Sequence, residues 1–374
     1  MSSTNNSLSE YFGEINDPRS GQNICHPLIN ILTIAICGAI CGADNWVEIE
    51  LFGNAKRSWF ESFLDLSHGI PSHDTFGRVF RAIDPAAFQA RFYQWTVAAR
   101  VRLEGEVLSV DGKTERGSKD GPLGTAALKM VSVWASENEL VLAQDRVEEG
   151  SNEITAIPSL LDLLDIENAV ITIDAAGCQT EIAEIIIQRQ ADYVLAVKKN
   201  QEWLLDDVQA AFEPTVPPLS ADYHRTVTKG HGRIEIRECW ALSDPEITAH
   251  INSYKTWPGL TSLVKVTYQR QTGQKVVRKT RYFISSLPPD AKCLLAAVRT
   301  HWHIENRLHW VLDWAFREDH NRSRRDHAAQ NLAVLRHIAL NLLKQEASLK
   351  VGIKAKRHRA GWDEQYLLKV LCAV

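Results

Sequence analysis

The 374-residue sequence predicts an α/β protein: a mixed β-sheet preceded by a helical region and carrying a β-rich insertion. Three observations support this prediction. Apolar and aromatic residues recur without strand-like alternation up to about residue 105, β-branched strand-length runs begin at 106, and helical and strand-like runs then alternate to about 213. With 45% hydrophobic and 24% charged residues, the composition is that of a globular protein.

Residues 1–105 are expected to form an N-terminal helical domain. The run 28–43 (LINILTIAICGAICGA) is shorter than the roughly 18–20 apolar residues of a membrane span, so a buried helix is expected. Ser72 or Asp74 can cap a short helix after a turn at 69–71, in a helix-turn-helix or a plain helical hairpin. Seven scattered cysteines without a CxxC pair indicate a reduced, cytoplasmic protein. Because the apolar run is too short to span a membrane, no membrane partner is expected.

Residues 106–213 are expected to form the first part of the core. The strand-like runs are 107–111, 130–134, 140–147, 169–174 and 192–198, and the helical runs are 154–166, 181–190 and 201–212. Three strands followed by alternating helices and strands is the order of the ribonuclease-H-like fold, in which the first and fourth strands are neighbours. The strands ending at Asp111 and Asp174 are therefore expected to lie side by side.

The second half of the chain begins with a Pro-rich break. Residues 214–289 are predicted to be an inserted β-rich unit, with strand-like runs at 223–242, 260–270 and 275–287. Asp290 can cap the next helix, and helices are expected to complete the core over 290–348. Residues 349–374 are interpreted as a basic C-terminal tail.

Asp111 and Asp174 each end an apolar strand and precede a loop of small residues, DGKT and DAAGCQ. The GKT is not a phosphate-binding P-loop, because Val107 stands where that motif needs a glycine. One strand-end aspartate is most often a turn cap, but two on neighbouring strands indicate a shared site. Gly112 is expected to turn the chain off the strand, and Lys113 is a candidate phosphate contact.

A third carboxylate comes from the amphipathic stretch 301–316 (HWHIENRLHWVLDWAF). Helical geometry places Glu305 between Leu312 and Phe316, on the apolar and inward stripe. A carboxylate aimed into a core needs a metal or an ion pair, and Arg299 or Arg307 is the alternative partner. Two aspartates and one glutamate form an all-oxygen set that suits Mg²⁺ or Mn²⁺, two of which can promote phosphodiester chemistry.

The motifs VLSVDGKT, ITIDAAGCQ and HWHIENRLHWVLDWAFREDHNRSR resemble those of DDE transposases of bacterial insertion sequences, above all the H-repeat-associated type. The resemblance covers essentially the whole chain. It implies that Asp111, Asp174 and Glu305 are the catalytic and metal-binding residues of a Mg²⁺-dependent transposase. Such an enzyme would bind terminal inverted repeats, cleave to free a 3′-OH and join it to target DNA, with a homodimer holding two ends.

Many relatives in the wider group carry a tyrosine, an arginine and a lysine around the glutamate. Here Val298, His301 and Leu312 stand at those positions, so His301, Arg299 or Arg307 are expected to take over the phosphate contacts.

The charge distribution suggests where double-stranded DNA would bind, although the net charge is −4. Residues 247–289 contain no acidic residue, and residues 317–360 contain 11 Lys/Arg against 4 Asp/Glu. Trp240 and Trp257 could stack on a base, but burial in a core is the commoner state of tryptophan. The candidate DNA-binding residues are Lys113, Arg233, Arg237, Lys265, Arg278, Lys279, Arg281, Arg299, His301, Arg307, Arg322, Arg324 and Arg325.

Two other functions remain open from the sequence. The chain could be a metal-dependent nuclease of the same fold without strand transfer, or a catalytically inactive DNA-binding relic. A phosphatase with an aspartyl nucleophile is disfavoured because Lys113 stands where that chemistry usually has a second aspartate. A zinc site is disfavoured because the sequence has no HExxH or Cys/His ligand spacing.

Overall fold

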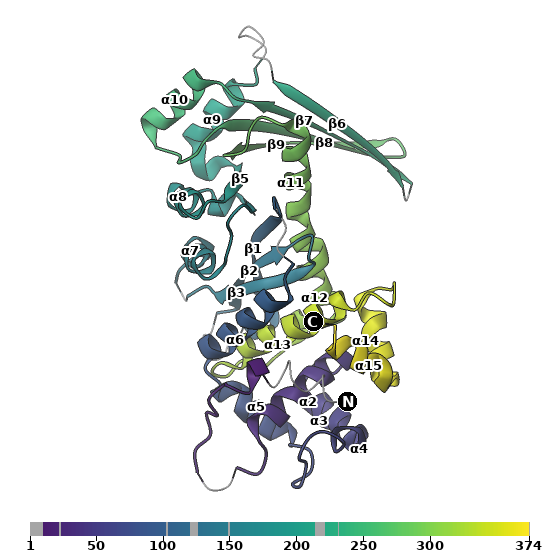
Figure 1. Ribbon diagram of the computed structural model, residues 1–374. Helices are drawn as coiled ribbons and strands as arrows, with labels where there is room; N and C mark the ends of the chain where they lie inside the picture. The colour runs from purple at the N-terminus through teal and green to yellow at the C-terminus, as the bar shows by residue number, and fades with distance from the viewer. Residues whose placement is uncertain are drawn as a thin grey trace.

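The computed structural model describes residues 10–21, 24–101, 104–119, 126–148, 150–213, 221–230 and 232–373. The Pro-rich break at 214–220 and His231, within the strand-like run predicted at 223–242, lie outside these residues. The chain is elongated, with projecting strands at one end and helices from both ends of the chain gathered at the other (Figure 1).

The described helices fall into three groups. Those of the N-terminal region are α2 (Leu28–Cys41), α3 (Trp46–Ala55), α4 (Arg57–Phe60), α5 (His73–Ala82) and α6 (Pro85–Ala99). Those between strands are α7 (Glu153–Leu163), α8 (Thr180–Gln188), α9 (Glu202–Ala210) and α10 (Pro245–Tyr254). Those of the C-terminal part are α11 (Ala291–His303), α12 (Trp310–Ala315), α13 (Ala328–Gln345), α14 (Ile353–Trp362) and α15 (Glu364–Leu371).

One mixed sheet runs through the described part of the chain. Its strands are β1 (Val107–Glu115), β2 (Leu128–Ala135), β3 (Leu140–Arg146), β4 (Val170–Ile173), β5 (Asp192–Val197), β6 (Asp222–Gly230), β7 (Arg233–Leu242), β8 (Ser262–Thr272) and β9 (Lys275–Ser285). Their order is β3-β2-β1-β4-β5-β9-β8-β7-β6. β1 is antiparallel to β2 and parallel to β4, with Val110 opposite Ile173. The α/β class and the pairing of the first and fourth strands are confirmed.

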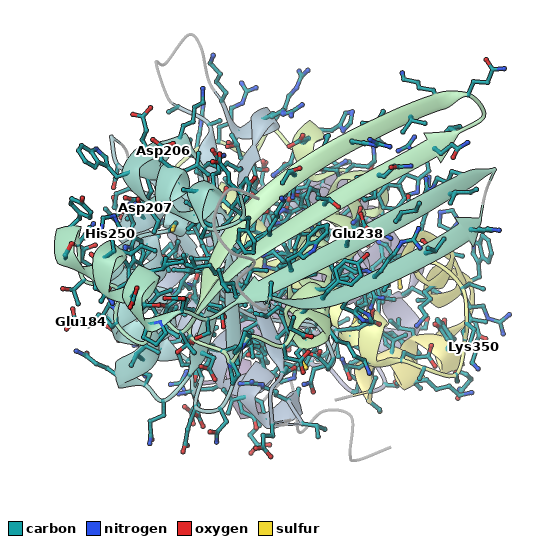
Figure 2. All side chains as sticks on the ribbon, turned by 90° about the horizontal axis from the view of Figure 1, so that it is seen from above. Glu184, Asp206, Asp207, Glu238, His250 and Lys350 are labelled. Atoms are coloured by element: carbon teal, nitrogen blue, oxygen red, sulfur yellow. The ribbon has the colours of Figure 1, made fainter. Side chains whose placement is uncertain are left out.

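The inserted strands belong to this same sheet. β9 pairs with β5, Ser285 opposite Val194, and β6 to β8 continue outward from β9. Their far ends project beyond the rest of the protein, with side chains on both faces (Figure 2). The sequence analysis missed α10, which begins where Asp244 accepts hydrogen bonds from two backbone N–H groups and Pro245 fixes the first turn.

The two faces of the sheet follow from side-chain alternation. Val110 of β1 belongs to the hydrophobic cluster that includes α7, α8 and α9, whereas Val107 and Val170 belong to the cluster formed with α11. Residues two apart in a strand share a face. Asp111 and Asp174, which continue the Val107 and Val170 alternation, therefore lie toward the face covered by α11.

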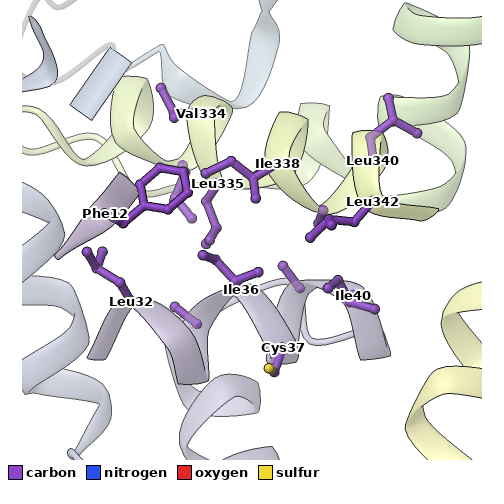
Figure 3. Packing of buried hydrophobic residues seen from close by; sticks show 14 of the residues in the cluster. Phe12, Leu32, Ile36, Cys37, Ile40, Val334, Leu335, Ile338, Leu340 and Leu342 are labelled. Carbon is purple, nitrogen blue, oxygen red and sulfur yellow. The ribbon is translucent and has the colours of Figure 1, made fainter. Parts of the chain in front are cut away.

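The helices from the two ends of the chain share one core. Leu32 and Ile36 of α2 face Leu335 and Ile338 of α13 (Figure 3). The buried helix predicted within 28–43 is confirmed, because α2 is buried along most of its length. Taken singly, no described helix has the length and hydropathy to span a membrane, while α2 and α3 together meet that test with a 96° bend between them.

The predicted C-terminal tail is wrong. α14 and α15 are packed helices, and Ala360 and Leu367 are fully buried in the core that includes α2 and α13. The basic residues misled the prediction because two of them are buried and hydrogen-bonded to main-chain carbonyls. Arg357 Nε donates to Ala39 O at 3.0 Å, and Lys356 Nζ donates to Leu343 O at 2.9 Å.

Asn341 of α13 covers the edge strand β3. Its side chain accepts from the N–H of Val141 and donates to the C=O of Val141, both at 2.9 Å and both buried. Asn341→Ala leaves both backbone groups unpaired, so we expect it to lower the free energy of unfolding by about 2 kcal/mol. Urea denaturation measures this loss. The control Gln345→Ala removes one partly buried bond to Asn138 O and should cost less. An equal loss in both variants would contradict the assignment.

Candidate functional site

Three acidic side chains converge on one cavity. Asp111, Asp174 and Glu305 all line a cavity of about 720 Å³, between β1, β4, β5, β9 and the helix that carries Glu305. Val110 and Ile173 are the last residues paired between β1 and β4, so both aspartates stand where the parallel pairing ends. The structure thus brings together the three carboxylates that the sequence analysis selected.

Gly112 does not turn the chain off the strand, as had been expected. β1 continues in register with β2 to Glu115, opposite Leu128. Glycine is needed there for space, because a Cβ at position 112 would lie 2.2 Å from the carboxyl carbon of Glu153.

Glu305 reaches the cavity by a different route from the predicted one. It is exposed and is not on the buried stripe, whereas Leu312 and Phe316 are buried. The physical reason is a π-helical segment, Ile304–His309, between α11 and α12. Its wider turn changes the angle between Glu305 and the residues that follow, which an ideal α-helical projection cannot show. Such segments often occur at functional sites.

The carboxylates repel one another. Burial, followed by the charges of Asp174, Glu305 and Glu153, raises the pKa of Asp111 to about 7. Among the described residues, no salt bridge joins a lysine or arginine to Asp111, Asp174 or Glu305, and the nearest histidine nitrogen, His309 Nδ1, lies 3.6 Å from Asp111 Oδ2. Burial lowers the pKa of His309 to about 3, so this imidazole carries no compensating charge near neutral pH.

The donor set fits a hard divalent cation. Carboxylate oxygens are the ligands that Mg²⁺ and Mn²⁺ prefer, and a cation among them would relieve the repulsion that raises the pKa of Asp111. Within the described ranges, no three acidic, histidine or cysteine side chains are already gathered at metal-binding distance. The fit therefore rests on donor type and charge.

Glu153, at the start of α7, is a fourth carboxylate that the sequence analysis missed. Its carboxyl group lies against Gly112, and burial and the charge of Asp174 raise its pKa. The only sequence signal was an acid in the first turn of a helix capped by Asn152, which is ordinary helix chemistry.

Lys113 is not a phosphate contact. Its ammonium lies inside the protein, where it pairs with Asp313 at 2.7 Å and with the buried Glu318. The reason is that β1 continues past Asp111 and carries Lys113 toward α12. Glu318 is 2% exposed and also lies 3.6 Å from Arg336.

His301 lines the cavity but offers no ionic contact to phosphate. Burial lowers its pKa to about 4, and its Nδ1 lies 3.1 Å from the hydroxyl of Thr172. The neutral imidazole therefore stands behind the carboxylates as a hydrogen-bonding group.

A second cavity of about 430 Å³ adjoins the first and is lined by basic side chains. Arg237 and Arg299 line it, and Lys279 and Arg281 line both cavities. The guanidinium of Arg281 lies 4.2 Å from the ring centre of Trp302, which also lines both. We call this second cavity the basic groove.

Four other predicted basic residues lie elsewhere. Lys265 lies over the ring of Trp240 and Arg278 bonds to Gln269, on the sheet face opposite α11. Arg307 pairs with Glu139 at 2.7 Å, and Arg233 pairs with Glu235 at the turn between β6 and β7. Trp257 is 3% exposed, in agreement with the expected burial.

Arg322, Arg324 and Arg325 line a third cavity, of about 820 Å³, together with residues of α3 and α5. The Nε of Arg324 donates to Gly117 O at 3.1 Å. Ser72 caps α5 at this cavity, where its hydroxyl accepts from the N–H of Thr75, one of the two capping alternatives.

Comparison with known proteins identifies the family. The model described as "Transposase DDE domain" matches residues 76–342, and the one described as "DDE_Tnp_1-associated" matches residues 9–96. "Putative transposase YncI" of Escherichia coli O157:H7 is 40% identical, covering 98% of this chain and 95% of that protein. "H repeat-associated putative transposase YhhI" of Escherichia coli K12 is 37% identical, covering 97% of each.

A solved synaptic complex of piggyBac transposase with hairpin DNA is 9% identical, with a TM-score of 0.44, covering 95% of this chain and 75% of that one. The two family matches and the near-full-length relatives confirm the resemblance seen in the sequence motifs. This chain therefore belongs to the DDE transposase family, and its relatives include the H repeat-associated transposases.

Proposed function

We propose that this protein is a divalent-metal-dependent DNA transposase. It binds the terminal inverted repeats of its own element, cleaves a phosphodiester to free a 3′-OH and joins that end to target DNA. The observation that carries the proposal is the convergence of Asp111, Asp174 and Glu305 on one cavity of a transposase-family chain. The strand order around β1 and β4 supports a ribonuclease-H-like core.

Each group in the cavity has a separate task in this proposal. Asp111, Asp174 and Glu305 would hold Mg²⁺ or Mn²⁺, two ions in all. When bound, these ions would supply the positive charge that activates the attacking oxygen and stabilises the leaving oxygen. Lys279 and Arg281 hold the DNA backbone beside the carboxylates, and the buried ion pairs of Lys113 fix the end of β1.

The N-terminal region has a distinct part in the proposal. The cavity lined by Arg322, Arg325, α3 and α5 lies outside the carboxylate site and combines arginines with two capped helix starts. Helix starts and arginines both attract phosphate. We assign this cavity to element-end binding, with two copies of the chain holding two ends.

The function is tested by a cleavage and joining assay on duplex DNA carrying the element's own end. In Mg²⁺, wild type should cut and join, whereas Asp174→Ala should bind the end without cutting. Asp162→Ala, an exposed α7 carboxylate paired with Arg189, is the control and should behave as wild type. Cutting without joining would indicate a nuclease. Binding without cutting in Mg²⁺ or Mn²⁺ would indicate an inactive relic.

The position of the DNA is tested by two matched double variants on neighbouring strands. Lys279→Gln/Arg281→Gln removes two cations that line both cavities, and Lys265→Gln/Arg278→Gln removes two from the opposite face. The first double variant should weaken duplex binding about tenfold. The slope of log affinity against log salt concentration should fall by about two, because two phosphate contacts are lost. The second should change affinity little. Equal losses, measured by fluorescence anisotropy at several salt concentrations, would remove the groove from the DNA path.

A further inference from the structure

Three tryptophans stand on the surface of the C-terminal helices. Trp310 and Trp314 of α12 are 58% and 57% exposed, and Trp362 at the end of α14 is 77% exposed. Large aromatic side chains are usually buried for the most part, and each of these leaves more than half of its surface in water. Their exposed surface is available to a ligand that covers flat aromatic faces.

The rings alternate with cationic or titratable side chains along one stripe. The rings of Trp310 and Trp314 lie parallel, 6.0 Å apart with 13° between their planes. Lys354 Nζ lies 4.7 Å from the ring centre of Trp314. One turn further along α14, His358 lies 5.6 Å from the ring of Trp362. We call these five residues the aromatic ridge.

The charge of the aromatic ridge is not neutralised by nearby carboxylates. Among the described residues, no salt bridge involves Lys354. The two neighbouring aspartates already have partners: Asp313 pairs with Lys113, and Asp363 pairs with Arg359. The stripe therefore offers open ring faces beside a cation that no carboxylate pairs with in the described part of the chain.

The aromatic ridge lies further along the same helical run that lines the basic groove, because α11, the π-helical segment and α12 follow one another without a break. Arg299 and Asn306 line that groove from α11 and the π-helical segment, and both are exposed. Trp310 and Trp314 follow Asn306 by four and eight residues, about one and two turns further along this helical run. The basic groove in turn shares Lys279 with the carboxylate cavity.

We propose that the aromatic ridge binds an unpaired DNA strand that leaves the carboxylate cavity through the basic groove. The proposal rests on the proposed function, because it needs DNA in that cavity. Exposed aromatic faces beside a cation suit single strands, since every base has a face that can stack while the cation meets the backbone. Paired bases within a duplex present no free face to the rings, which favours a single strand over duplex DNA.

The test compares two DNA probes that share one duplex end. One probe is blunt and the other carries a single-stranded extension of about ten nucleotides, within the usual size of such sites. Fluorescence anisotropy in Ca²⁺, at one fixed salt concentration, gives both affinities. Wild type should bind the extended probe more tightly. Trp310→Ala/Trp314→Ala should lose about tenfold or more on the extended probe and little on the blunt one.

Two further variants separate stacking from a general defect. Trp203→Ala removes a tryptophan that is 73% exposed on α9, where it lies against Tyr254, and should leave both affinities unchanged. Trp314→Phe keeps an aromatic face and should retain most of the binding to the extended probe. If Trp314→Phe were as defective as Trp314→Ala, stacking would not be the mechanism and the proposal would fall.

The remaining outcomes are distinct. Equal binding of both probes by wild type would overturn the single-strand proposal and leave the proposed function intact. Failure of wild type to bind either probe would overturn both. If sedimentation shows that Trp310→Ala/Trp314→Ala changes the oligomeric mass while the extended-probe affinity stays the same, the ridge is a protein–protein surface and the proposal is wrong.

Discussion

Replacing Asp111 by asparagine is expected to abolish strand cleavage and, in the same experiment, to make the metal-free protein more stable. The loss of activity should be at least about a thousandfold, because the carboxylate is one of three that hold the metal in the proposed mechanism. The gain in stability follows from burial and from the charges of Asp174, Glu305 and Glu153, which raise the pKa of Asp111 to about 7. The ionised carboxylate of Asp111 therefore destabilises the folded, metal-free protein.

The pH dependence has a definite sign. An unfolded aspartate has its ordinary pKa of 3.8, whereas folded Asp111 holds its proton up to about pH 7. Between these values the folded state binds more protons than the unfolded state, so stability falls as pH rises. The asparagine variant lacks this loss. The difference in free energy of unfolding in its favour should be small at pH 4 and reach about 4 kcal/mol above pH 7.

Urea denaturation in EDTA at pH 5 and pH 8 measures this difference. Addition of Mg²⁺ should then raise the stability of wild type and leave the variant almost unchanged, because the metal binds mainly the intact carboxylate set. A variant that is less stable than wild type at pH 8 in EDTA would show that the carboxylates do not repel one another. Such an exchange of stability for activity is common where a site needs buried charge.

The parts of the fold and site that the sequence could predict depend on local patterns. The side-by-side placement of Asp111 and Asp174 follows from two β-branched runs in a known strand order, and the structure places them so. Glu305 was selected as the third carboxylate and does line the cavity, but its predicted place on the buried stripe was wrong. The ideal α-helical angle pointed inward, and the π-helical segment that contains Glu305 departs from that angle.

The errors arose where charge was taken to mean exposure. Glu153, Glu318 and Arg357 are titratable residues in short C-terminal or helix-terminal stretches, where side chains are usually solvated. The structure half-buries the first and fully buries the other two, each against partners far away in the sequence. Alternation along β9 does separate Arg278 from Lys279, since successive strand residues point to opposite faces. This alternation can be read from the amino-acid sequence, so the sequence is sufficient to assign Arg278 and Lys279 to opposite faces of the sheet.

Glu318→Gln is expected to produce the largest loss of stability among single changes near the site. Glu318 is 2% exposed and lies between Lys113, whose side chain is 12% exposed, and Arg336, which is buried. Burial raises the pKa of Glu318, but the charges of Lys113 and Arg336 together with its hydrogen bonds outweigh this and lower it. The residue is therefore an anion that compensates these two cations. Removing such an anion costs about 3–5 kcal/mol, which thermal or urea unfolding would measure.

Glu115 is the matched control, because it is equally buried in the same network. It is also 2% exposed and lies 3.9 Å from Arg336, but burial and the charge of Glu318 raise its pKa to about 8. Of the two carboxyls it is the one whose pKa is raised and which therefore holds a proton more readily, and glutamine has the shape of that neutral acid. Glu115→Gln should therefore cost less than about 1 kcal/mol. Similar losses in both variants would show that the two carboxyls share their charge instead of dividing into one anion and one acid.

The double variant decides how the network compensates. In Glu318→Gln, the repulsion on Glu115 disappears while Arg336 remains, so Glu115 is expected to ionise and to recover part of the lost stability. In Glu115→Gln/Glu318→Gln no carboxyl remains to ionise. The loss in free energy of unfolding should therefore exceed the sum of the losses in the two single variants. Because Lys113 is two residues from Asp111 on β1, the same loss would loosen the strand that holds the first catalytic carboxylate. We therefore expect variants that destabilise this network also to displace Asp111 and to weaken metal binding at the site.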